Sequence, residues 1–272
     1  MRLVESRATL IVCYVALSIF AFIALFPIAL LVLNSLKPAA QIVQNPLGLP
    51  NPIRWENFAH AWSHAKFSKT FINSLIVSGT TIVLVCSTSS LTAYVLARRK
   101  IKSWKVFTFY LLATTTAPIQ LYIFPLYFGF AKLGLINNIF GVALIYTALY
   151  SPFAVMLLRT YFIAVPKELE EAAIGRQVFW RVMLPIVSPG ILTVALIIGL
   201  NSWNEFLVAT TFLQKAENVT AVIAFYLLSG QYSSDWGEIM AAALIIVIPV
   251  VALFVFMQKR FIEGMAGGSV KG

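Results

Sequence analysis

Long apolar runs separated by shorter polar segments dominate the chain. Six of these runs approach or exceed the 20 or so residues that a helix needs to cross the hydrocarbon core of a bilayer. They cover residues 10–36, 71–97, 106–130, 139–158, 191–213 and 237–256. The pattern predicts an all-α, polytopic membrane protein whose residues 1–272 form a single transmembrane domain.

The longest polar connection, residues 37–69, begins with proline-rich sequence and continues as a predicted amphipathic helix near residues 55–67. Glu56, His60 and His64 fall on one face of that helix, and two histidines four residues apart can hold zinc. Because nothing nearby in the sequence completes a metal site, we favour an exposed helix face at the membrane surface. Residues 214–236 are interpreted as a second polar segment.

The connection at residues 166–190 has a different pattern. Proline at its start and acidic residues in the following turn predict a short helix that begins at Pro166. Pro185 and Pro189 are then expected to break helical continuity before the next apolar run. In residues 106–130, Pro118 and Pro125 open the helix backbone, which is tolerated where the helix lines a cavity or neighbouring helices compensate.

Composition and charge narrow the class of protein. With 60% hydrophobic and 11% charged residues, the chain is not a soluble domain. The net charge of +10 raises the question of a nucleic-acid partner. Six spans place 14 of the 20 lysines and arginines on the side of the termini and six on the other side. By the positive-inside rule, both termini and the 166–190 segment are cytoplasmic, so the basic charge is an orientation signal and not a nucleic-acid surface.

Candidate chemistry lies within the predicted spans. The chain has no G-x-x-x-x-G-K-[ST] sequence and no evident catalytic arrangement, so we expect neither a bound nucleotide nor an enzyme. Glu205 is an ionisable residue in a span, which is functional by default. Its alternative roles are a carboxylate at the helix end or a structural hydrogen bond. Asn201 and Asn204 are predicted to share its helix face beside Trp203, a mixture that suits a sugar. Weaker pathway candidates are Gln120, Tyr122 and Tyr146.

The segment PKELEEAAIGRQVFWRVMLPIVSPG resembles the signature loop of the permease subunits of bacterial ABC importers, in their carbohydrate-uptake, maltose-permease-like branch. In that family the loop forms a cytoplasmic coupling helix that seats in a groove of a separate ATPase. The chain departs from the family pattern, because its loop is five residues shorter and lacks the usual aspartate. The resemblance implies coupling roles for Glu168, Glu171, Ala172, Ala173, Gly175, Phe179, Leu184 and Pro185.

The sequence SWNEF at residues 202–206 also resembles the fifth span of sugar permeases, where it borders the translocation cavity. The resemblance implies a multi-pass protein of the bacterial inner membrane that carries a sugar or oligosaccharide. Its expected partners are a second permease subunit, two ATPase subunits that bind ATP and Mg, an extracytoplasmic solute-binding protein and membrane lipid. An ion-coupled secondary transporter using Glu205 and a non-transporting membrane scaffold are the alternatives.

Overall fold

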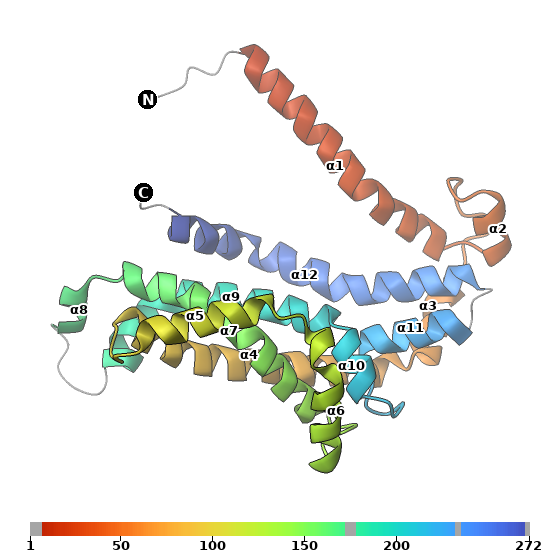
Figure 1. The fold of residues 1–272 in the computed structure, drawn as a ribbon. Helices are drawn as coiled ribbons and strands as arrows, with labels where there is room; N and C mark the ends of the chain where they lie inside the picture. The colour runs from red at the N-terminus through yellow and green to blue at the C-terminus, as the bar shows by residue number, and fades with distance from the viewer. Residues whose placement is uncertain (1–6, 172–177, 232–234, 270–272) are drawn as a thin grey trace. The chain divides into compact units, whose positions relative to one another are not determined.

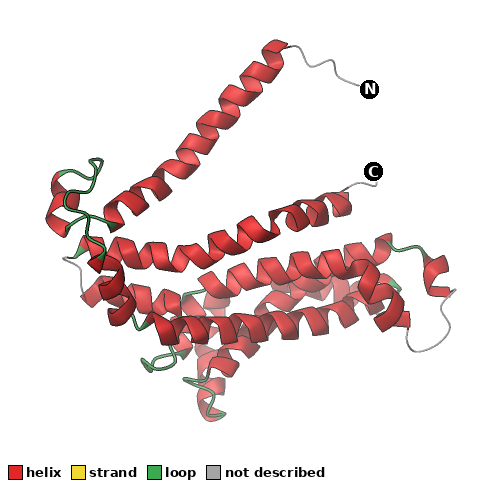
Figure 2. Cartoon of the chain, turned by 180° about the vertical axis from the view of Figure 1, so that it is seen from behind, coloured by secondary structure: helices red, strands yellow, loops and turns green. Residues whose placement is uncertain are grey.

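The computed structural model describes residues 7–171, 178–231 and 235–269. The described residues form helices, turns and loops without a strand (Figure 1; Figure 2), which confirms the all-α prediction. The chain divides into two compact units. The first comprises residues 1–67 and 225–249, and the second comprises residues 68–224 and 250–272. The prediction of a single transmembrane domain remains a prediction.

The first unit contains α1 (Arg7–Ser35), α2 (Ala39–Gln44), α3 (Glu56–His64), most of α11 (Ala221–Gln231) and the beginning of α12 (Trp236–Ser269). The apolar side chains of α1 are exposed along its length and are free to face lipid or another chain. After α1, the side chain of Lys37 is fully buried. Its ammonium donates to Asn34 Oδ1 at 2.9 Å, Asn45 O at 3.2 Å and Pro46 O at 2.9 Å. All three N–H groups are thus satisfied, which closes the loop after α1.

The second unit contains most of α4 (Phe67–Ala97), and α7 (Ile139–Ala164) packs there against α5 (Trp104–Thr116) and α9 (Leu184–Asn204) (Figure 1). Gly190 marks a close approach, because a Cβ at this position would lie 2.6 Å from Tyr161 Cγ of α7. Leu158, Phe162 and Met183 are fully buried in the core beside this contact. The unit also contains a 3-10 turn (Ile119–Leu121), α6 (Ile123–Lys132), α8 (Lys167–Glu171), a π-helical turn (Phe179–Met183), α10 (Leu207–Phe212), the first residues of α11 and the end of α12.

Five helical stretches of the described chain are long and apolar enough to cross a membrane: Thr9–Ser35, Phe67–Ala97, Ile139–Ala164, Phe179–Asn204 and Trp236–Gln258. They correspond to five of the six predicted spans. The prediction of one helix over residues 106–130 was wrong, because α5 ends at Thr116 and Ala117 is extended, with ψ 113°. Steric conflict with the ring of Pro118 disfavours the helical conformation at the preceding residue. The count of six spans therefore remains a prediction.

The predicted limits of the fifth span, residues 191–213, were also wrong. Helical structure begins at Phe179 and ends at Asn204, with α10 as a separate helix. Pro185 lies in the first turn of α9, where a missing N–H is tolerated, and Pro189 lies inside the helix without ending it. The segment 214–236, interpreted as polar, contains the apolar helix α11. Polar residues at both of its ends concealed this helix in the sequence.

Candidate functional site

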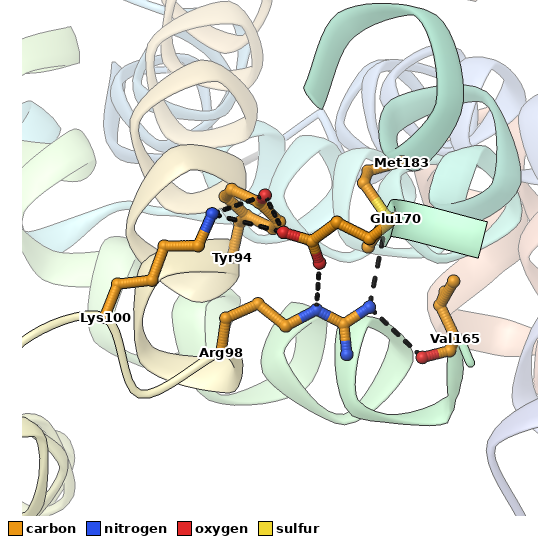
Figure 3. A network of polar contacts seen from close by, with 6 residues as sticks. All are labelled: Tyr94, Arg98, Lys100, Val165, Glu170 and Met183. Atoms are coloured by element: carbon orange, nitrogen blue, oxygen red, sulfur yellow. Dashed lines mark hydrogen bonds and ion pairs between the residues drawn. The ribbon is translucent and has the colours of Figure 1, made fainter. Parts of the chain in front are cut away.

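The short helix α8 is held against the end of α4 by its residue Glu170 (Figure 3). The hydroxyl of Tyr94 donates a hydrogen bond to Glu170 Oε1. Lys100 Nζ lies 3.1 Å from the same oxygen, and Arg98 Nε lies 2.6 Å from Glu170 Oε2. Helix α8 begins at Lys167, directly after Pro166 and one residue later than the sequence predicts. Three side chains from the end of α4 and the turn after it therefore converge on a single carboxylate.

Arg98 is the most deeply placed member of this group, with 7% of its side chain exposed, against 18% for Glu170 and 48% for Lys100. Its Nη2 donates to Val165 O at 3.1 Å and lies 4.0 Å from Met183 Sδ. Arg98 thus joins the end of α4 to the segment between α7 and α8 and to the π-helical turn before α9. Charge-assisted bonds of this kind are about twice as strong as neutral ones.

The charge state of Glu170 follows from this geometry. Burial by itself would raise the pKa of its carboxyl group, because a low-dielectric environment disfavours the charged form. Hydrogen bonds from Tyr94 and Lys100 and the positive charges of Lys100 and Arg98 outweigh that effect, and the pKa lies below its ordinary value of 4.5. The carboxylate is therefore ionised at neutral pH and forms ion pairs with Arg98 and Lys100 at the end of α4.

The predicted coupling residues occupy several environments. Glu168 is exposed on α8, whereas Ala172, Ala173, Gly175 and the side chain of Glu171 lie outside the described residues. Phe179 is buried, with its ring centroid 5.3 Å from that of Tyr94. At the start of α9, Leu184 is half-buried and Pro185 is exposed. Contact of these residues with an ATPase therefore remains a prediction.

Sequence analysis did not predict the contacts of Glu170 with Tyr94, Arg98 and Lys100, which we call the Glu170 anchor. It counted Arg98 and Lys100 only among the basic residues on the side of the termini, and it named no partner for Glu170. The available signal was electrostatic, because a cluster of acids and a cluster of bases were both expected on the same side of the membrane. Sequence alone cannot choose which acid meets which base, since Glu168 and Glu170 are equally charged.

Glu205 lies where α9 gives way to α10. Its Oε1 accepts a hydrogen bond from Val208 N at 3.0 Å, and its Oε2 accepts one from Ala209 N at 3.0 Å. The hydroxyl of Tyr146 donates to Oε2 at 2.6 Å. The carboxylate thus satisfies N–H groups at the beginning of α10, as an N-terminal capping side chain does. Because α9 ends at Asn204, the prediction that Glu205 continues a shared helix face was wrong.

The other predicted pathway residues are placed separately. Asn201 and Asn204 are exposed near the end of α9, and Asn204 Nδ2 donates to the backbone oxygen of Leu200 at 2.9 Å. Trp203 is buried, with its ring 5.5 Å from that of Phe71 in an edge-on arrangement. Gln120 is exposed in the 3-10 turn.

Tyr122 lines a largely apolar pocket of about 470 Å³ between α5, α6 and α7. The polar wall of this pocket includes Thr114 and Ser151, together with Tyr110. Among the hydrogen bonds of the described residues, Tyr146 and Glu205 are the two predicted pathway residues that bond to each other. Of the predicted pathway residues, the structure therefore connects Tyr146 and Glu205 by a direct hydrogen bond.

Comparison with known proteins identifies the family. Residues 89–267 match the family described as "Binding-protein-dependent transport system inner membrane component". The chain belongs to this family. The family's relatives include the diacetylchitobiose uptake system permease protein NgcG of Streptomyces coelicolor, which is 32% identical over 267 residues covering 96% of this chain and 88% of NgcG. The melibiose/raffinose/stachyose import permease protein MelC of Bacillus subtilis is 31% identical, with 100% of both chains covered.

A solved structure of a bacterial ABC transporter involved in the import of the acidic polysaccharide alginate is similar to this chain. The TM-score is 0.77, at 25% sequence identity, over 94% of this chain and 98% of that chain. The predicted resemblance to ABC importer permeases is thus confirmed, and the protein is a multi-pass inner membrane component of such a system. These relatives favour the importer over an ion-coupled transporter that uses Glu205.

Proposed function

We propose that this binding-protein-dependent permease forms half of the translocation pathway of an ATP-driven importer for a sugar or oligosaccharide. The family match over residues 89–267 carries the proposal. The named relatives, which take up diacetylchitobiose or import melibiose, raffinose and stachyose, support the substrate class. The complete importer would contain a second permease subunit, two ATPase subunits and an extracytoplasmic solute-binding protein.

Helix α8 is the proposed coupling helix that seats on the ATPase. The ion pairs of its residue Glu170 with Arg98 and Lys100 support this role, because they would make the end of α4 move together with α8. The chain has no P-loop, so ATP and Mg would be bound by the ATPase subunits. Nucleotide would then bias a two-state, rigid-body transition of the permease.

The proposed orientation places both termini and α8 in the cytoplasm, as the distribution of lysine and arginine predicts. Cysteines introduced in place of Lys167 and of Lys215 test it in a background without native cysteines. A membrane-impermeant maleimide added to intact cells should label the Lys215→Cys variant, whereas the Lys167→Cys variant should react after permeabilisation. Labelling of the Lys167→Cys variant in intact cells would overturn the orientation.

The exposed amides of Asn201, Asn204 and Gln120 are the side chains we assign to the pathway. Amide groups can both donate to and accept from sugar hydroxyls. Glu205 would act on this surface indirectly, because its carboxylate sets the position at which α9 ends and α10 begins. Tyr146 would hold that carboxylate in place.

Reconstitution in proteoliposomes tests the transport function. This chain together with its partner permease, the ATPase subunits and the solute-binding protein should import radiolabelled oligosaccharide when ATP is present. A hydrolysis-deficient ATPase should abolish uptake while leaving assembly intact. Uptake by this chain alone, driven by a proton or sodium gradient, would refute the proposal and support ion-coupled transport.

A further inference from the structure

Three cationic side chains surround one indole ring at the turn between α4 and α5. The centroid of the Trp104 ring lies 4.8 Å from Arg99 Cζ, 5.8 Å from Lys105 Nζ and 5.6 Å from Arg159 Cζ. Arg159 belongs to α7, so the cluster is assembled from two segments that are distant in sequence. We call Trp104 and these three side chains the cationic cluster.

The positive charge of the cationic cluster is not balanced within the described chain. The neighbouring Arg98 and Lys100 are paired with Glu170, but no salt bridge among the described residues involves Arg99, Lys105 or Arg159. The Nε atom of Arg159 is buried without a hydrogen-bond partner in that part of the chain. Mutual repulsion opposes the gathering of like charges, so this arrangement favours an anion from outside the chain.

The backbone of Arg99 has an unusual conformation. Arg99 lies two residues beyond Ala97, the last residue of α4, and has a φ of +53°, in the left-handed region that favours glycine or asparagine. Its amide bonds to Leu96 O at 3.3 Å, which helps to close the turn. This conformation places an arginine over the Trp104 ring at a position where glycine is the usual residue.

An apolar groove lies at the same turn. It has a volume of about 280 Å³ and is lined by Leu91, Thr92, Val95, Leu96, Ile101 and Phe107. The first turns of α5 carry further exposed apolar side chains, including Val106 and Phe109. A cationic cluster beside an apolar groove matches the chemistry of a phospholipid, whose phosphate is charged and whose acyl chains are apolar.

We propose that the cationic cluster and the groove beside it bind one anionic phospholipid of the leaflet at this end of the bundle. Arg99, Lys105 and Arg159 would bind the phosphate, and an acyl chain would lie along Val95 and Phe107. The groove favours a lipid over free phosphate, because free phosphate has no apolar part to bury. This site is separate from the transport function and does not depend on the identity of the sugar.

Native mass spectrometry of the purified full-length chain, titrated with dioleoylphosphatidylglycerol, tests the site. The double variant Arg99→Asn with Lys105→Gln removes two charges, and asparagine tolerates the positive φ of residue 99. Two basic contacts account for a loss in affinity of about 30-fold. The control Lys132→Gln with Lys215→Gln removes the same charge from positions outside the cationic cluster and should bind the lipid as the unmodified chain does.

A neutral lipid and a groove variant test the charged and the apolar parts of the site separately. Dioleoylphosphatidylcholine should bind weakly to every variant, and Val95→Trp should reduce phosphatidylglycerol binding by filling the groove. Thermal unfolding without added lipid should be the same for the Arg99→Asn, Lys105→Gln variant and its control. Equal affinity in those two double variants would overturn the proposal. Binding of glycerol 3-phosphate with the affinity of the intact lipid would also overturn it, because the groove would then have no role.

Discussion

Replacement of Glu170 by glutamine tests whether the anchor holds α8 against the end of α4. Glutamine keeps the shape of the side chain and one acceptor oxygen but removes the negative charge. Arg98, whose side chain is 7% exposed, would then lose its ion-pair partner in the described chain. The variant therefore isolates the electrostatic part of the anchor.

The expected magnitude follows from burial. Removing one partner of a fully buried ion pair costs about 3–5 kcal/mol, whereas an exposed pair is worth less than about 1 kcal/mol. Glu170 is 18% exposed and Lys100 is 48% exposed, so the interaction lies between these limits. We expect the anchored state of α8 to lose about 2–3 kcal/mol, a change of about 30- to 140-fold in its ratio to the released state.

Hydrogen–deuterium exchange on the full-length chain in lipid nanodiscs measures this ratio. Peptides that cover α8 should exchange faster in the Glu170→Gln variant, while peptides from the middle of α7 should be unchanged. Glu168→Gln is the matched control, because Glu168 lies on the same helix, is exposed, and makes no hydrogen bond or ion pair within the described chain. In the assembled importer, the Glu170→Gln variant should hydrolyse ATP with reduced sugar uptake.

The dependence on pH has a definite sign. The pKa of Glu170 is lowered on folding from its ordinary value of 4.5, so its contribution is complete above that value. It is lost as the pH falls through the lowered folded-state pKa. The difference between the unmodified chain and the Glu170→Gln variant should therefore shrink in acid. Equal exchange of α8 in the two proteins at pH 7 would refute the reasoning.

Four other single substitutions test the packing and capping. Glu205→Ala should cost about 1–3 kcal/mol by leaving the first N–H groups of α10 unpaired, and Tyr146→Phe, which removes one of the carboxylate's donors, should cost less; chemical denaturation in detergent would rank them. Gly190→Ala should cost about 1–3 kcal/mol because its Cβ meets the Tyr161 ring, and a thermal midpoint restored by adding Tyr161→Ala would identify that clash as the cause. Lys37→Met should lower the thermal midpoint, since removing the ammonium leaves the buried Asn34 Oδ1 without its donor at about 1–3 kcal/mol and also releases Asn45 O and Pro46 O; an unchanged midpoint would contradict the role assigned to its ammonium.

Hydrophobic length and charge distribution could be interpreted without a structure. A run of 20 apolar residues has few alternatives to a membrane-spanning helix, because backbone groups in lipid must bond within the chain. This rule predicted the helices that became α1, α4, α7 and the membrane-spanning part of α12. Short motifs with several residues in fixed order also identified the family, independently of any packing.

Residues with local ambiguity were decided by tertiary structure. Proline is tolerated or disruptive depending on what surrounds it, so Pro118 ended a helix while Pro189 did not. Glu205 has the same charge whether it faces a pathway or caps a helix, and the neighbouring Tyr146 and the N–H groups of α10 decided its position.

The anchor at Glu170 shows the same division. Composition could indicate that acids and bases share one side of the membrane, because their number and their order along the chain are sequence properties. Which carboxylate meets Arg98 depends on distances of a few ångströms between α4 and α8, and those distances are set by how α7 and the turn before α9 pack. The sequence by itself therefore determined the class of transport protein. Tertiary packing determined which side chains connect its helices, since electrostatic and capping interactions act only at short range.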